Sequence, residues 1–546
     1  MRGLRRLAAT ALGAFALLAA PEVSAREPAP SPDPQPGELH PVTTDDDPHD
    51  DFAAFPLIVP HDKHWLRAGL EVSAVVIVGF VDYLLNTRAR GGIVRPGDER
   101  FALRYEWSDL RGKFVGNAYE LDANRFGTNY VAHPVAGAAY YQVARSNHLT
   151  FGESYLFSLL GSALWEYFGE IRERVSVNDM FVTPSAGAAI GETTMQLAGF
   201  FDRGAKTWSN RALSFAFAPI KFLNDLADVS ETRRDPVTDA LGFPAAPWHR
   251  FEARAGLAAT TQAKARGPAG VTPRAAYTDV RFGLDLEVTN LPGYRGSARH
   301  SRLFDDGNVS ALFVRGAVSG GEVVDFLAGT RIVPIGFYHR DARVDSRGRL
   351  RGQGLVVGYR MSFEYGVHDY DRDRQRARDL VSVVSPLGVA VEHVVDAGPV
   401  HVRTGIDVFG SISGVAPYAL GDFVARRGTS EGLPTAVKNN GYYHSIGVAA
   451  APFVEVGWDT LRLSGHMRVD SFRAIEGLDE ANDLVDRRLD IADRRASASA
   501  VLAWEPRFAP LRLAFGAERG FRHGQVGPAR ASRDEASLSS TLGVRF

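Results

Sequence analysis

Seven polar residues between positions 133 and 192 could do chemistry if the fold brings them together. They are His133, Glu153, Glu166, Glu170, Asn178, Asp179 and Glu192. All lie in or beside apolar helical segments, and a buried ionised carboxylate costs several kcal/mol unless it is paired or takes up a proton. We therefore expect each to have a structural partner or a task.

Two kinds of chemistry fit these residue types. A hydrolase acting on lipid would use His133 as its base and Ser154 or Ser158 as its nucleophile. A metal site would take carboxylates from facing helices plus a histidine, although the Glu-x-x-His pairs of di-iron bundles are missing. Hydrogen bonding to helix ends is the more common role. The absence of GxSxG, HExxH, P-loop and Rossmann motifs leans against an enzyme but leaves the question open, and we expect no cofactor or metal.

Three helical stretches must position these residues. Residues 135–145 and 151–174 are apolar with helical periodicity, and Glu166 and Glu170 share one face of the second stretch. Residues 176–179 predict a turn, and Thr183 or Ser185 predicts the N-cap of a third helix. Small residues every four positions, Gly187, Gly191 and Gly199, predict close packing on a neighbouring helix. The simplest arrangement is a bundle that gathers His133, Glu153, Glu166, Glu170, Asn178 and Glu192.

An earlier segment, residues 64–86, is long and apolar enough to suggest a transmembrane helix. Glu71 and Asp82 argue against a lipid-exposed span, because each carboxylate is costly at membrane depth. We therefore predict a core helix.

Three motifs resemble a known family. AHPVAGAAYYQVAR (132–145), SALWEYFGE (162–170) and SVNDMFVTPSAGAAIGE (176–192) together resemble an uncharacterised bacterial envelope family, domain of unknown function 3943 (DUF3943). The resemblance covers roughly residues 120–205. It implies a location and an architecture but no activity, so no catalytic role is carried over.

From Trp248 onward the hydrophobic period changes to two. Phe251, Ala253 and Ala255, for example, alternate with charged residues. Twelve such segments have centres near residues 254, 284, 313, 327, 360, 388, 405, 450, 466, 500, 514 and 542. An even number of strands with apolar outer and charged inner faces predicts a transmembrane β-barrel whose lumen carries ion pairs. The predicted fold class is an α+β membrane protein, an N-terminal helical bundle followed by an antiparallel transmembrane barrel of about 12 strands.

Polar stretches at 292–307, 341–352, 366–379, 426–440 and 472–492 are predicted to be extracellular loops. The chain ends on Phe546, and a C-terminal aromatic resembles the recognition signal of outer-membrane barrels. We therefore expect the barrel-assembly machinery and outer-membrane lipids as partners.

The N-terminal segments and the composition indicate that the protein is exported and set the bounds of its domains. Residues 1–25 have the basic, apolar and small-residue regions of a signal peptide, and 26–55 form a Pro- and Asp-rich linker. The helical domain is then 56–230 and the barrel 245–546. The chain has no cysteine, and 62 Lys and Arg against 64 Asp and Glu leave a net charge of −2, so we expect no nucleic-acid partner.

Three functions follow for the outer membrane of a Gram-negative bacterium. The first is a barrel with a helical domain that plugs it or docks beneath it in the periplasm, serving in transport or envelope organisation. The second is a lipid-modifying hydrolase with its site in the helical domain. The third is a structural anchor of the envelope.

Overall fold

The computed structural model describes residues 57–58, 62–89, 107–115, 118–170, 173–228, 237–262, 266–267, 270–271, 275–305, 309–370, 378–479 and 484–546. The predicted signal peptide and linker lie outside these residues. No helix in this part of the chain is long and apolar enough to cross a membrane.

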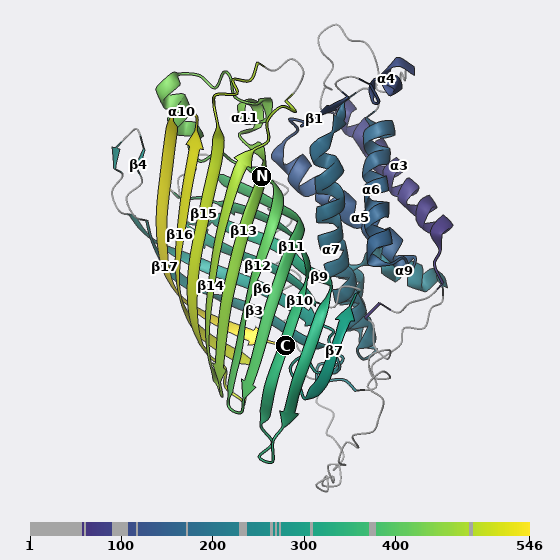
Figure 1. Cartoon of the computed structure of the whole chain (residues 1–546), viewed down its shortest axis with the longest axis vertical. Coiled ribbons are helices and arrows are strands. Elements are labelled where there is room, and N and C mark those ends of the chain that lie inside the picture. Colours follow the sequence, from purple (N-terminus) through teal and green to yellow (C-terminus); the bar gives the residue numbers. More distant parts are fainter. Residues whose placement is uncertain are drawn as a thin grey trace. The chain divides into compact units, whose positions relative to one another are not determined.

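The helical part comes first (Figure 1). Its elements are α3 (Trp65–Ala89), α4 (Trp107–Gly112), β1 (Tyr119–Glu120), η1 (Thr128–Ala132), α5 (His133–Ser146), α6 (Phe151–Leu164), η2 (Trp165–Gly169), β2 (Val175–Ser176), α7 (Val177–Arg203), α8 (Trp208–Phe217) and α9 (Pro219–Asp228). Helices α5, α6 and α7 pack on one another, and α3 packs on α5 and α6. The helix predicted at 64–86 is therefore present as α3. Its predicted core position was wrong, because only Ala68 and Val72 are buried among its described side chains, and the helix lies at the surface of the helical part.

The start of α7 differs from the prediction. Residues 176–179 do not form a separate turn, because the Ser176 hydroxyl caps the helix by accepting a hydrogen bond from the Asp179 amide at 3.2 Å. Pro184, which we predicted next to an N-cap, lies inside the helix. The helix thus starts earlier than predicted, and Asn178 and Asp179 belong to its first turn.

The glycine face of α7 packs as closely as predicted. A Cβ atom at Gly187 would lie 2.4 Å from the backbone carbon of Gly137 in α5, and one at Gly191 would lie 2.7 Å from the Tyr141 ring. Only glycine permits the first of these backbone approaches.

Twelve strands form a closed antiparallel barrel. They are β3 (Trp248–Gln262), β6 (Ala275–Thr289), β8 (Val309–Ser319), β9 (Glu322–Val344), β10 (Leu350–His368), β11 (Asp379–Ala397), β12 (Val400–Val415), β13 (Tyr443–Trp458), β14 (Leu461–Ala474), β15 (Ile491–Trp504), β16 (Leu511–Val526) and β17 (Ala529–Arg545). The ring closes because β17 pairs with both β16 and β3. Each of the twelve predicted centres lies within one of these strands, so the predicted fold class is confirmed.

Three short strands lie outside the ring. They are β4 (Arg266–Gly267), β5 (Gly270–Val271) and β7 (Ala298–Phe304). We call the end of the barrel where β3 starts and β17 finishes the inner end, and the opposite end the outer end. The stretches at 292–307 and 341–352, predicted as extracellular, connect strands at the inner end. The other three stretches lie at the outer end, so the prediction that all five are extracellular was wrong. Antiparallel order, and not loop composition, decides the end at which a connection lies.

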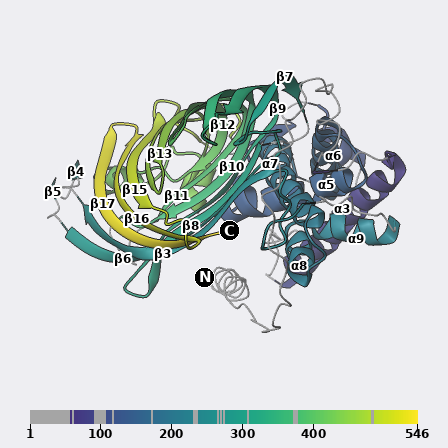
Figure 2. The ribbon, with the colours of Figure 1, turned by 90° about the horizontal axis from the view of Figure 1, so that it is seen from below.

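The helices pack on the outside of the barrel (Figure 2). Val182 and Ala186 of α7 contact outward-facing Val384 of β11 near the outer end, and Ala188 and Ala189 contact Ile332 and Met361 in the middle. At the inner end, Phe200 and Phe201 pack on Phe251 and Leu286. In the described residues the helical part therefore neither plugs the barrel nor docks beneath it, because α7 buries its apolar face on the outward residues of the strands.

Candidate functional site

Residues 416–442, which we call the cap, fill the outer end of the lumen. The cap joins β12 to β13 and contains α10 (Leu420–Arg427) and α11 (Thr435–Asn440). Phe423, Leu433 and Val437 of the cap are buried against inward residues of the strands, namely Val383, Phe409, Phe472, Ile491 and Val526. An apolar core thus occupies the outer mouth of the barrel.

A buried ion cluster holds the beginning of the cap. The fully buried guanidinium of Arg522 contacts Asp379 at 2.9 Å and Asp493 at 2.9 Å, and donates a hydrogen bond to the Ala416 carbonyl at 3.0 Å. The Tyr418 amide donates to Asp493 at 3.2 Å. Three strands are therefore tied to the first residues of the cap.

A second segment, residues 290–297, enters the lumen at the inner end, and we call it the inner plug. Its Leu291 and Tyr294 are buried against inward residues that include Tyr338, Val356 and Ala390. The Tyr294 hydroxyl donates a hydrogen bond to Glu392. Both ends of the lumen are thus occupied by connecting segments.

Ion pairs cross the lumen between these two segments, as the inner faces of the strands predicted. Arg250 of β3 reaches Glu455 of β13 at 3.1 Å, although four strands separate them on the shorter arc. Arg468 of β14 reaches Glu364 of β10 at 2.6 Å. These pairs hold distant strands together and narrow the passage.

The remaining lumen contains a chamber of about 770 Å³. It lies against β12 to β17 and β3, and its inward-facing residues include Phe453, His466, Ser499, Glu518 and Ser537. Small side chains on β15 and β16 leave this half of the lumen wider than the half filled by arginine pairs.

Five of the seven predicted residues lie together where the helices meet the cap. The junction cluster consists of Asp122, Asn129, His133, Glu166, Asn178 and Asp179. Asn178 donates to Asp122 Oδ1 at 3.1 Å and to Asp179 Oδ1 at 3.0 Å, and it accepts from the Asp122 amide at 3.0 Å. His133 Nε2 lies 3.6 Å from Asp179 Oδ2. Glu170 lies beside the cluster, just beyond η2.

Hydrogen bonds join this cluster to the end of the cap. Asn440 donates to the Ala123 carbonyl at 2.6 Å, and the Tyr442 hydroxyl donates to the Asn124 carbonyl at 2.7 Å. His444, the second residue of β13, contacts the Asp122 carbonyl through Nε2 at 2.8 Å and the Tyr130 hydroxyl through Nδ1 at 2.8 Å. The helical part therefore holds the end of the cap, as the barrel holds its beginning.

The carboxyl groups of the cluster favour their protonated forms. Burial raises the pKa of Glu166 to about 8, against the backbone hydrogen bond from Ser176, which lowers it. Burial, followed by the nearby charge of Asp122, raises the pKa of Asp179 well above its ordinary value. Burial and the charge of Glu173 do the same for Glu170. Desolvation lowers the pKa of His133, so neutral histidine faces neutral acids.

Three oxygens of the cluster lack hydrogen-bond partners among the described residues. They are Oδ1 of Asn129, Oε1 of Glu166 and Oδ2 of Asp179. A buried carboxylate oxygen without a partner is costly, whereas a protonated carboxyl group leaves far less charge to satisfy. The carboxyl oxygens without partners and the raised pKa values therefore both indicate that these carboxyl groups are protonated.

The other two predicted residues lie elsewhere and have structural partners. Glu153 closes the capping box of α6 with Thr150 and pairs with Lys63 at 2.8 Å. Glu192 lies in the middle of α7 and pairs with Arg145 at 3.0 Å, while Tyr141 and Gln196 also donate to it. Neither residue reaches the junction cluster.

The serines of the predicted hydrolase are not placed for catalysis. The Ser158 hydroxyl donates to the Gly137 carbonyl at 3.0 Å, and the Ser154 hydroxyl donates to the Leu149 carbonyl at 3.5 Å. Both serve helix packing, and the described contact of His133 is a carboxylate.

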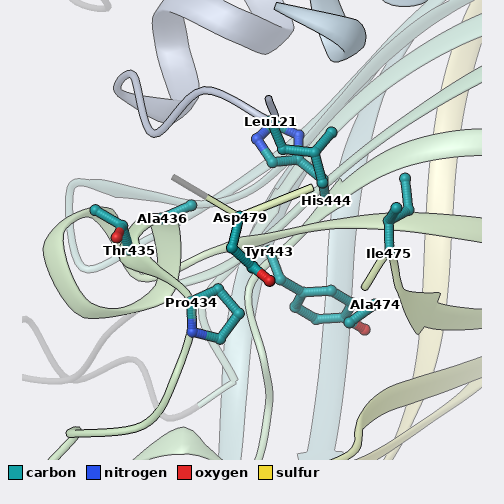
Figure 3. Close-up of a pocket in the computed structure, with 9 residues that line it drawn as sticks. All are labelled: Leu121, Pro434, Thr435, Ala436, Tyr443, His444, Ala474, Ile475 and Asp479. Atoms are coloured by element: carbon teal, nitrogen blue, oxygen red, sulfur yellow. The ribbon is translucent and has the colours of Figure 1, made fainter. Parts of the chain in front are cut away.

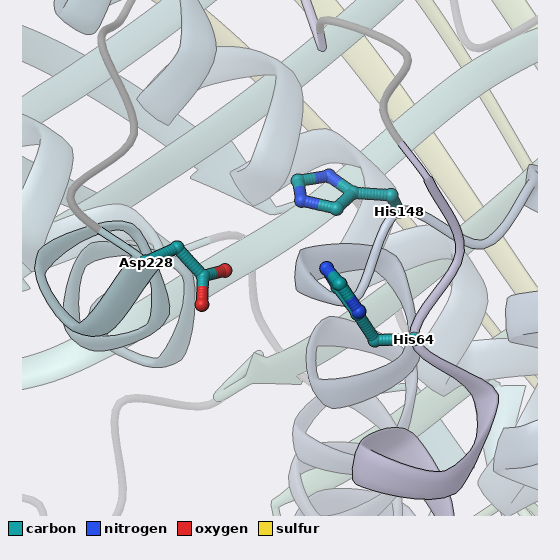
Figure 4. A group of neighbouring side chains, drawn as sticks. All are labelled: His64, His148 and Asp228. Atoms are coloured by element: carbon teal, nitrogen blue, oxygen red, sulfur yellow. The ribbon is translucent and has the colours of Figure 1, made fainter.

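One group of residues with metal-ligand chemistry escaped the prediction. His64, His148 and Asp228 lie with their ligand atoms within 4.8 Å of one another (Figure 4). Arg67 already donates to both oxygens of Asp228, at 2.8 Å to Oδ2. The three residues come from separate segments, so no local spacing could have revealed them.

A small cavity of about 20 Å³ lies where Leu121 meets Pro434, Tyr443 and His444 (Figure 3). It has room for one water molecule and no larger ligand. Asn129, Glu166, Asn178 and Asp179 of the junction cluster are themselves buried, so these polar groups form a seam inside the protein.

Comparisons with known proteins found similar solved structures and one family model. The solved structures that resemble it include the porin NanC (7% identity, 53% of this chain and 100% of the other, TM-score 0.22), a Pseudomonas aeruginosa FadL homologue (10%, 55% and 91%, 0.20) and the outer membrane channel DcaP of Acinetobacter baumannii (11%, 57% and 100%, 0.19). TM-scores of this size carry no functional information. No curated protein matches. The family model described as Domain of unknown function (DUF3943) matches residues 118–220, the segment that holds the junction cluster, and this match confirms the resemblance that the three motifs predicted.

Proposed function

We propose that the protein is an outer-membrane β-barrel of the transport type in a Gram-negative bacterium, whose passage is closed by the cap and the inner plug. Closed antiparallel strands with apolar outward residues and charged inward residues support a place in the outer membrane.

The lumen chamber carries this proposal. A barrel that served only as an anchor could fill its interior completely, as small barrels do. Here a space of about 770 Å³ remains against the strands, and the two segments that enter the lumen are connecting segments and not strands. Loops can move while the strand ladder stays intact, because their displacement breaks no interstrand hydrogen bond. The chamber therefore fits a small solute that enters when a loop moves aside.

The helical part would act on this passage through the cap. Its hydrogen bonds to Asn440, Tyr442 and His444 fix the end of the cap from outside the lumen. A change in the junction cluster would reach the cap directly through these bonds. We assign the helical part the role of holding the closed state.

Conductance of the purified protein in planar bilayers tests the proposal. The variant Phe423→Ala/Leu433→Ala removes two buried side chains from the cap core, and each such truncation costs about 2–5 kcal/mol of packing. We expect low conductance for the natural protein and frequent larger openings for the variant.

The matched control is Val424→Ala, on the same cap helix, where the side chain is partly exposed. It should conduct like the natural protein. Silence of the natural protein and of the double variant alike, with both showing the heat-modifiable gel migration of a folded barrel, would contradict a transport role.

A further inference from the structure

The outer surface of the helical part carries an apolar face with no partner in the described residues. On α3 it consists of Leu66, Leu70, Ile77, Val78 and Val81, and on α6 of Leu156 and Leu160. Leu66 is 78% exposed and Ile77 is 61% exposed. Spacings of three, four and seven residues place these side chains on one side of each helix. A water-facing helix would carry charged residues there.

The depth of this face is set by its packing on the barrel. Helix α7 runs along the outward side of the strands from Val384 near the outer end to Phe251 at the inner end. Helices α5 and α6 pack on α7, and α3 packs on α5 and α6. The helices therefore occupy the same height as the strands of the barrel wall.

Charged residues avoid the middle of this height. No charged residue lies between Glu153 and Glu166 in α6, between Glu71 and Asp82 in α3, or between His133 and Arg145 in α5. The interval in α6 is about 18 Å long, and the apolar band of an outer-membrane barrel is about 25 Å tall. The charged ends correspond to the two rims of that band.

Arg145, the charged end of the α5 interval, pairs with Glu192 of α7, and the pair faces the inside of the bundle. Glu192 of α7 is fully buried and Arg145 of α5 is 4% exposed, and they neutralise each other at 3.0 Å. Polar groups inside a bundle are tolerated at membrane depth when they are paired and turned away from lipid. Helices whose polar groups are paired inside the bundle can contact lipid through their outer face without a high mean hydropathy along the whole helix.

The barrel wall shows the same division between covered and lipid-facing residues. On β11, Val384 is fully buried under α7, whereas Leu387 is 67% exposed and Val389 is 51% exposed. The helices thus replace lipid along one part of the wall and present a new apolar surface in its place.

We infer that the helical part lies within the outer membrane beside the barrel, with the apolar face of α3 and α6 in contact with lipid acyl chains. This inference rests on the proposed location of the barrel. We choose lipid as the occupant of this face because of where the charges lie. Contact with acyl chains explains why the residues at the height of the apolar band of the barrel are uncharged while charged residues lie at both ends of it.

The absence of cysteine allows a direct test with single labelled cysteines. Ile77→Cys on α3 and Leu160→Cys on α6 probe the apolar face. Met467→Cys, on the outward side of β14, is the lipid reference, and Leu484→Cys, in an exposed loop at the outer end, is the water reference. A fluorophore on each cysteine is read in vesicles of phosphatidylcholine with brominated acyl chains, and again with iodide in the water. Heat-modifiable migration confirms the folding of each variant.

We expect brominated lipid to quench the labels at positions 77 and 160 to an extent similar to that at 467, while iodide quenches only the label at 484. Quenching by iodide at 77 and 160 would overturn the inference and leave the proposed function standing. Protection from both quenchers would also overturn it, because protein, such as a second copy of the chain, would then cover the face. Failure of lipid to quench the label at 467 would instead refute the membrane location of the barrel.

Discussion

Glu166→Gln tests the electrostatics of the junction cluster most directly. The Glu166 side chain is fully buried, its Oε2 accepts from the Ser176 amide at 2.8 Å, and its Oε1 has no partner in the described residues. Glutamine keeps the shape and the acceptor but cannot ionise. It therefore mimics the protonated acid at every pH.

The sign of the effect follows from the pKa values. Burial raises the pKa of Glu166 from 4.5 to about 8 in the folded protein. Between these values the unfolded chain releases a proton that the folded chain keeps, so the free energy of unfolding falls as the pH rises through this window. The difference between the two pKa values corresponds to about 4–5 kcal/mol.

Urea unfolding at pH 4.5 and pH 8.5, followed by tryptophan fluorescence, measures this contribution. Trp165 is the neighbour of Glu166 in the chain and can report the change. We expect Glu166→Gln to match the natural protein at pH 4.5 and to be several kcal/mol more stable at pH 8.5, by an amount up to the estimate above.

Glu153→Gln is the matched control. Burial tends to raise the pKa of Glu153, but hydrogen bonds from Lys63 and Thr150 outweigh burial and lower it. That carboxylate therefore stabilises the fold above pH 4.5, and its replacement should lower stability at pH 8.5. Equal pH dependence of unfolding in Glu166→Gln and the natural protein would refute the reasoning.

Two further predictions concern the helical core. Arg145→Met leaves the Glu192 carboxylate buried without its cation and should lower the free energy of unfolding by about 3–5 kcal/mol in the same urea titration, and adding Glu192→Gln should restore most of the loss. Gly187→Val should abolish heat-modifiable migration, because its Cβ would lie 2.4 Å from the backbone of Gly137. Gly152→Ala, where nothing lies within 4 Å, should stay within about 1 kcal/mol of the natural protein.

The strands were predictable because the barrel repeats one local rule. Each strand alternates between lipid-facing and lumen-facing residues, so neighbours such as Arg250 and Phe251 reveal their sides without knowledge of any partner. The cap offered no such rule. Its buried Phe423 and Leu433 lie among polar residues with no period of two, and their partners come from distant strands.

The junction cluster was only partly predictable. Asp122 was missed because it lies in a Gly- and charge-rich connection and reaches its role through Asn178 and His444, far along the chain. Glu192 was wrongly grouped with Asn178, because helical periodicity shows which face of a helix a residue lies on but not its position along the helix axis. The two residues are about 20 Å apart along one helix, which the rise per residue could have shown.

The packing of α7 on the barrel also has a consequence for the order of assembly. Helix α7 is complete in the chain before the first barrel strand begins at Trp248, yet its apolar face is covered by residues as late as Ile412. Phe546, the last residue, packs in the cluster that contains Phe200 of α7. The helices therefore complete their packing only on the finished barrel wall. Before the barrel closes, the chain exposes the most apolar surface, and at this stage it is most prone to aggregation.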